Sequence, residues 1–159
     1  MENGFDPEAG KVSLMLHTFV GKDVESVKAK VRKPFREYLR SAISLEEQAA
    51  MSGGVISGGH KIQPHDIPPD VMEELLDLTF ERYFREAALM GTPESCQEFV
   101  STLTDIGVDE IACLIDFLDD YEAIMESLRY LDMVRVVQSA QFLNNAYANS
   151  LRAFIDDIA

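Results

Sequence analysis

The chain has 159 residues, of which 47% are hydrophobic and 26% are charged. This length and composition are typical of one soluble globular domain with a core of its own. The formal net charge is −14, and the excess lies in residues 66–159, where 5 basic residues face 20 acidic ones. Such an acidic half repels nucleic acids and anionic lipid, which excludes both as expected partners. No apolar run approaches the roughly 20 residues of a membrane span, and the acidic N-terminus lacks a secretory pattern, so we expect a cytoplasmic protein.

The cysteine and histidine residues predict neither a disulfide framework nor a metal site. Cys96 and Cys113 fall in apolar segments, which favours buried free thiols. His60 and His65 flank a loop rich in glycine and proline, and no third ligand lies near them in the sequence. We therefore expect two solvated loop histidines and no bound metal.

The first regular element expected is a strand over residues 11–20, KVSLMLHTFV, which is mostly apolar. A short run of this kind is typical of a strand buried on both faces of a sheet. Asp23 follows and is suited to cap a helix, with Ser26 and Val27 in its first turn. An apolar stripe with helical spacing continues this helix beyond Pro34, where we expect a kink or a restart.

Glycine and proline interrupt the pattern over residues 52–69, which we expect to form a flexible loop. A long helix is predicted to follow, with Gly91 as its C-cap. The next helix has a clear start, because Thr92 suits the N-cap and Pro93 suits the first helical position. We expect this helix to end at Gly107.

A second buried strand is predicted over residues 108–117, followed by a helix over 119–138 and a weaker amphipathic segment over 138–159. Two buried strands separated by helices favour a parallel sheet of the α/β class. Because two strands do not form a stable sheet alone, the pattern indicates the end of a larger barrel whose earlier strands are absent.

Four blocks of sequence, in this order, carry a resemblance to a known family. They are Leu14–Gly21 (LMLHTFVG), Val31–Ser41 (VRKPFREYLRS), Phe80–Phe84 (FERYF) with Gly91–Cys96 (GTPESC), and Gly107–Phe117 (GVDEIACLIDF). Together they resemble the FMN-dependent luciferase-like monooxygenases that are embedded in nonribosomal peptide and polyketide assembly lines.

The resemblance implies a (β/α)8 barrel, which needs about 250 residues and has its active site at the carboxyl ends of its strands. We therefore expect residues 11–137 to be the C-terminal portion of such a barrel, a helix-rich and partial (β/α)8 fold. Residues 1–10 are expected to be an N-terminal extension and residues 138–159 a helical tail. The family uses FMN, but much of its binding cradle belongs to the absent strands, so we expect that this chain alone does not bind FMN.

Three residues near the predicted strand ends are candidates for the remaining site. His17 is the candidate catalytic residue, because imidazole titrates near neutral pH and can hydrogen-bond flavin, substrate or peroxide. The alternative for His17 is a buried histidine satisfied by backbone groups. Thr18 and Asp116 are candidate cofactor-binding residues, and the alternatives are a strand cap for Thr18 and a helix cap for Asp116. The family usually has glycine where this chain has Leu118, which counts against flavin binding.

Four arginines on the predicted helices offer another place for a phosphate group: Arg36, Arg40, Arg82 and Arg85. For these residues we favour ion pairs with the many carboxylates, or a solvated helix face.

Two functions follow as hypotheses. The first is the C-terminal segment of a flavin-dependent monooxygenase of natural-product biosynthesis, completed by an N-terminal barrel half on another polypeptide. The second is a non-catalytic remnant that acts as a scaffold or docking module for an assembly-line protein, or pairs as a homodimer through an open sheet edge. A generic acidic helical domain would match the composition and would leave the four ordered blocks unexplained.

Overall fold

The computed structural model describes residues 10–51 and 67–136. Its elements are β1 (Ser13–Val20), α1 (Val24–Met51), α2 (Pro69–Arg82), a π-helical turn η3 (Tyr83–Ala87), β2 (Leu89–Gly91), α3 (Pro93–Asp105) and β3 (Glu110–Leu114). A further helix occupies residues 121–136. The predicted tail and almost all of the predicted extension and loop lie outside the described residues. None of the described helices has both the length and the apolar character needed to cross a membrane.

The three strands form one parallel sheet in the order β2-β1-β3. β1 lies at the centre, because it pairs with β3 from Ser13 to His17 and with β2 from Thr18 to Val20. The expected α/β class, with a parallel sheet and a majority of helix, is confirmed.

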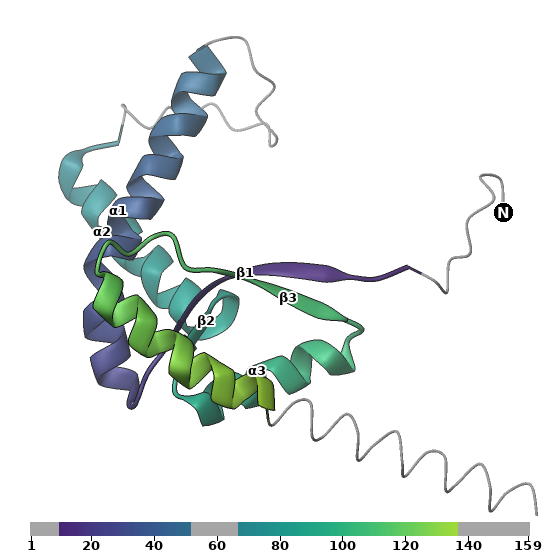
Figure 1. The fold of residues 1–159 in the computed structure, drawn as a ribbon. Helices are drawn as coiled ribbons and strands as arrows, with labels where there is room; N and C mark the ends of the chain where they lie inside the picture. Colours follow the sequence, from purple (N-terminus) through teal and green to yellow (C-terminus); the bar gives the residue numbers. More distant parts are fainter. Residues whose placement is uncertain (1–9, 52–66, 137–159) are drawn as a thin grey trace, which may run out of the picture.

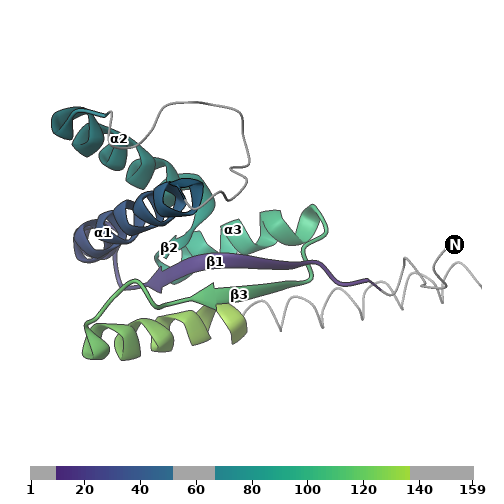
Figure 2. The same ribbon diagram turned by 90° about the horizontal axis from the view of Figure 1, so that it is seen from above.

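Helices cover both faces of this sheet, as Figures 1 and 2 show from two directions. One core cluster joins Phe19 and Met90 of the sheet to α1 and α2. The other cluster joins Leu16 and Leu89 to α3 and to the second half of helix 121–136. The side chains of a strand alternate between faces, so each strand contributes to both clusters.

The strand order differs from that of a (β/α)8 barrel. Consecutive strands of a barrel are neighbours and all helices lie outside them, so β2 would lie between β1 and β3. Here the chain passes from β2 back across β1 to β3. The rule of right-handed crossovers then requires α3 on the face opposite α1 and α2, and it lies there. The described residues form a small open sheet of the doubly wound type.

The start of α1 agrees with the sequence, and the helix continues past Pro34 without a break. The backbone N–H of Ser26 donates a 2.8 Å hydrogen bond to Asp23 Oδ1, which confirms the predicted cap. α1 then runs as one helix through Pro34, so of the two expected alternatives, a kink or a restart, the restart is wrong. Burial of Val31 and Phe35, both fully shielded from solvent, fixes this helix against the sheet and outweighs the local cost of about 3 kcal/mol.

Ion pairs tie α1 to α2 along their shared edge. The guanidinium of Arg32 donates to Asp77 Oδ1 at 2.9 Å and to Glu81 Oε1 at 2.8 Å. Lys28 Nζ lies 2.6 Å from the other oxygen of Glu81. The guanidinium carbon of Arg32 also lies 5.2 Å from the ring centre of Phe80, a cation–π contact at the edge of the core.

The helix predicted up to Gly91 divides into α2, η3 and β2, so the assignment of Gly91 as a C-cap is wrong. Leu89, Met90 and Gly91 are all buried, and they pair with Thr18, Phe19 and Val20 of β1. β2 is stabilised by pairing with β1, which lies far away in the sequence. Reasoning from the local sequence therefore could not predict this strand.

The predicted start and end of α3 are confirmed. Thr92 and Ser95 form a capping box, in which each backbone N–H donates to the other residue's hydroxyl oxygen. At the end, Gly107 has a φ of 94°, a left-handed conformation that favours glycine, and its N–H donates to Thr104 O.

β3 lies where a strand was predicted, but the expectation that it is buried is wrong, because none of its five residues is fully buried. β3 is an edge strand, and Met15 of β1, which pairs with Ala112 of β3, is 65% exposed. Both cysteines are free thiols as predicted, and Cys96 is buried as expected. The expectation that Cys113 is buried is wrong, because Cys113 is exposed on the edge strand β3.

Candidate functional site

His17 lies on β1, half-buried within a cluster of aromatic rings. The imidazole packs edge-on against Phe35 and Tyr38 of α1, with ring centres 4.9 and 4.7 Å apart. Phe117, after β3, lies at 5.9 Å, and Tyr83 of η3 lies at 6.4 Å. Three separate segments therefore enclose one side chain of the central strand.

The His17 ring has a buried nitrogen without a partner. Among the described residues, no hydrogen-bonding group reaches Nε2, which is shielded from solvent. Burial lowers the pKa of His17 below its ordinary value of 6.5, and the nearby charge of Asp116 raises it in part. The site therefore holds a neutral imidazole at neutral pH. The alternative of a buried histidine satisfied by backbone groups is not met at Nε2, because this atom has no partner among the described residues.

Asp116 is brought to the same side as His17. β3 pairs Leu114 with His17, and the chain leaves the strand there, so Asp116 follows two residues later. Its carboxylate is exposed and close enough to act on the imidazole. The alternative role of Asp116 as a helix cap is not observed, because Asp120 Oδ1 accepts the N–H of Ala123 at the start of helix 121–136.

Thr18 lies on the opposite face of β1 and does not join this cluster. Its side chain is 1% exposed, and its hydroxyl donates to Leu16 O at 2.9 Å. The hydroxyl is thus satisfied by its own strand, as the alternative interpretation expected. Successive side chains of a strand point to opposite faces of the sheet, so the sequence alone already placed Thr18 on the face opposite His17.

A cavity of about 300 Å³ lies beside the His17 cluster, with Tyr38 and Phe117 in its wall. Three carboxylates, Glu37, Asp116 and Asp119, also line it, and no lysine or arginine does. FMN carries a phosphate dianion, which this wall would repel. The residues that line this cavity therefore do not fit the phosphate group of FMN.

Leu118 reinforces this conclusion. It is 8% exposed and packs in the core cluster of α1 and α2, next to Phe117. Its side chain fills the turn after β3, where glycine would leave the backbone open to a ligand.

Three of the four arginines considered for phosphate binding, Arg36, Arg40 and Arg85, are engaged in ion pairs. Arg36 and Arg40 of α1 both bind the carboxylate of Glu73 on α2. Arg85 binds the neighbouring Glu86 and is exposed. The favoured interpretation of these three arginines is confirmed. No group of three or more metal-binding side chains gathers anywhere in residues 10–51 and 67–136.

The aromatic surroundings of His17 were missed at the sequence level. Phe35 and Tyr38 sit on one helical stripe, and that spacing is a signal for a shared face. Tyr83 and Phe117 come from segments that meet His17 only through the sheet order. Comparison with protein-family models and with curated proteins gives no match to this chain.

Proposed function

We propose that this chain is the C-terminal segment of a flavin-dependent luciferase-like monooxygenase of natural-product biosynthesis, and that it works only with a second part that supplies the flavin site. The observation that carries the proposal is the series of four sequence blocks in family order. Residues of these blocks gather around His17: Phe35 and Tyr38 from the second block, Tyr83 from the third and Phe117 from the fourth.

In this proposal, His17 acts as a base or hydrogen-bond partner at the substrate. A neutral imidazole accepts a proton, and the Asp116 carboxylate stabilises the imidazolium that results. The aromatic rings hold the imidazole in one orientation and exclude water from Nε2. FMN would be held by the other part of the enzyme, because the wall beside His17 is acidic.

The proposal is tested by reconstitution. We expect that the purified chain alone does not change the absorbance or fluorescence of FMN. Co-expression with an N-terminal flavin-binding part from the same biosynthetic complex should give a flavin-containing, oxygen-consuming complex. His17→Gln should lower turnover in that complex and leave the flavin spectrum intact, while Thr18→Ser, a matched change on the opposite face, should preserve turnover. Tight FMN binding by the isolated chain would contradict the proposal, as would a complex without flavin.

A second candidate is a non-catalytic scaffold or docking module in a biosynthetic complex. The strand order β2-β1-β3, with α3 opposite α1 and α2, favours it, because this order does not continue into a barrel. Under this function, His17→Gln would leave product formation unchanged, while removal of the whole chain would abolish it. Sedimentation at several concentrations tests the related prediction of a homodimer formed through the open sheet edge.

A further inference from the structure

β2 is at the edge of the sheet and is nevertheless buried. One side of it pairs with β1, and no strand of the described residues lies on the other side. Leu89 is 2% exposed and Met90 is 6% exposed. An edge strand normally has its free backbone groups in water, so a buried edge requires an explanation.

The hydrogen-bond pattern identifies the free groups as those of Met90. Gly91 O accepts the N–H of Gly21 at 2.9 Å, so the backbone groups of Gly91 and Leu89 point toward β1. Those of the intervening Met90 then point to the outer edge. Within residues 10–51 and 67–136, no hydrogen bond reaches them there. One donor and one acceptor are thus left in a largely dry place, spaced as a further strand would use them.

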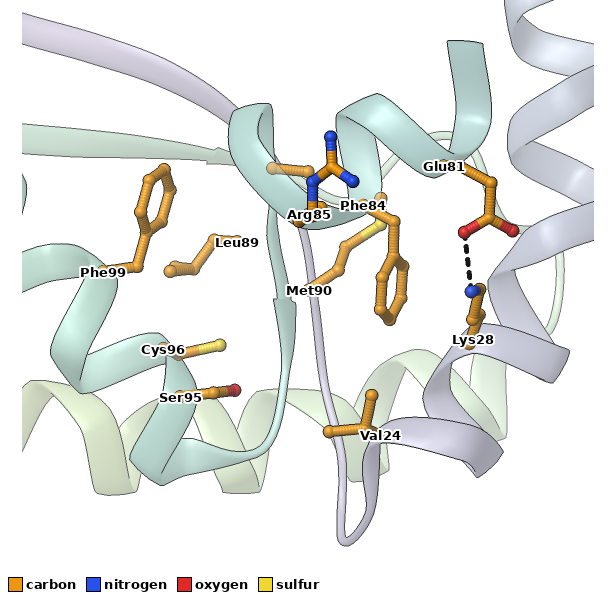
Figure 3. Close-up of a pocket in the computed structure, with 11 residues that line it drawn as sticks. Val24, Lys28, Glu81, Phe84, Arg85, Leu89, Met90, Ser95, Cys96 and Phe99 are labelled. Carbon is orange, nitrogen blue, oxygen red and sulfur yellow. Dashed lines mark hydrogen bonds and ion pairs between the residues drawn. The ribbon is translucent and has the colours of Figure 1, made fainter. Parts of the chain in front are cut away.

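A groove of about 340 Å³ runs along this outer edge (Figure 3). Leu89, Cys96 and Phe99 lie on one side of β2, and Met90 and Phe84 lie on the other. An extended peptide directs alternate side chains to opposite faces, so it would meet an apolar wall with each of them.

The charged side chains of the groove are already paired. Lys28 binds Glu81 at 2.6 Å and lies 5.6 Å from the ring centre of Phe84. Arg85 pairs with Glu86. Burial raises the pKa of the Cys96 thiol to about 12, so that it is neither charged nor nucleophilic. The groove therefore favours neutral backbone and apolar side chains over an anion.

We propose that the outer edge of β2 binds an extended apolar segment of a partner polypeptide, which pairs with Met90 and continues the sheet. Basic residues flanking that segment would favour the encounter, because the chain carries a net charge of −14. This inference does not depend on the proposed flavin chemistry.

The test uses a defined probe, the capped peptide Lys-Lys-Val-Ile-Val-Ala-Val-Lys-Lys, and a second version that is N-methylated at alternate central residues. N-methylation removes strand hydrogen bonds and preserves charge and apolar area. We expect saturable binding of the first peptide, at least about tenfold weaker binding of the second, and about tenfold slower amide hydrogen exchange at Met90 in the complex. Equal binding of the two peptides, or unchanged exchange at Met90, would overturn the proposal.

A matched pair of variants locates the site. Phe99→Lys alters a half-buried residue of the groove, while Leu78→Lys alters an α2 residue that is 64% exposed and outside the groove. Binding should fall at least about tenfold in the first and remain unchanged in the second, with circular dichroism as the check on folding. Equal effects in both variants would overturn the proposal. Self-association of the wild-type chain that Phe99→Lys abolishes would also overturn it, because the groove would then be filled by a second copy.

Discussion

The backbone N–H of Val20 donates a 2.8 Å hydrogen bond to Ser127 Oγ, across 107 positions of the sequence. β3 pairs with β1 only as far as His17, and β2 lies on the other side of β1, so among the described residues no strand lies beside the β3-facing edge of β1 beyond His17. The Ser127 hydroxyl takes the place that a strand carbonyl would occupy. This contact ends the ladder and fixes helix 121–136 against the carboxyl end of β1.

Ser127→Ala should lower the free energy of unfolding by about 1–3 kcal/mol, because Val20 N–H would remain buried without an acceptor. The measurement is the urea-unfolding midpoint with its slope. Ser101→Ala is the matched control, since Ser101 is an exposed residue of α3, and it should change stability by less than about 0.5 kcal/mol. Equal losses in the two variants would show that the Val20 contact contributes nothing specific.

A second test concerns the turn that follows β1. A Cβ on Gly21 would lie 2.7 Å from Val27 Cγ2, and Val27 is 2% exposed. Gly21→Ala should therefore cost about 1–3 kcal/mol in the wild type. In a Val27→Ala background the clashing methyl group is gone, so the same change should cost clearly less. A double-mutant cycle measured by urea unfolding gives this coupling, and additive costs would exclude the clash as the cause.

The elements that the sequence predicted best are those with complete local signals. Asp23 caps α1, and Thr92 with Pro93 starts α3, because the groups that satisfy a helix N-terminus lie within a few residues of it. β1 was also recognised, since a short and mostly apolar run bounded by turn residues is typical of a strand in a parallel sheet.

The elements that the sequence missed depend on distant partners. Leu89 and Met90 continue an apolar helical stripe, and they become a strand only because β1 supplies the hydrogen bonds. Strand order is not encoded in apolar periodicity, so the central place of β1 and the exposure of β3 did not follow from the pattern. Placing a strand at an edge exposes residues that would be buried at the centre.

The candidate site was predicted in part. His17 and Asp116 were selected separately as residues near strand ends, and the parallel pairing of β1 with β3 brings them together. The rings around His17 were not predicted, because Tyr83 belongs to the π-helical turn η3, which no sequence rule indicated. Such turns arise where tertiary packing overrides the α-helical spacing.

The cap of α3 gives a third test. Thr92→Ala removes the side-chain acceptor of Ser95 N–H and should cost about 1 kcal/mol. Thr102→Ala, an exposed change within the same helix, should be neutral or slightly stabilising because alanine favours helix more than threonine. Thermal unfolding followed by circular dichroism compares the two variants. A Thr92→Ala variant as stable as the wild type would mean that the capping box is not formed in solution.

The buried imidazole of His17 should make stability depend on pH near neutrality. Because burial lowers its pKa in the folded state below 6.5, the unfolded chain binds more protons than the folded chain as pH falls through 6.5. The contribution of His17 is thus fully present above 6.5 and is lost as pH falls toward the folded pKa. His17→Phe should flatten the dependence of the urea midpoint between about pH 7.5 and 5.5. Asp116→Asn should steepen it, because that charge raises the pKa of His17 and its removal lowers the pKa further. If His17→Phe keeps the wild-type slope, groups other than this imidazole control the pH dependence.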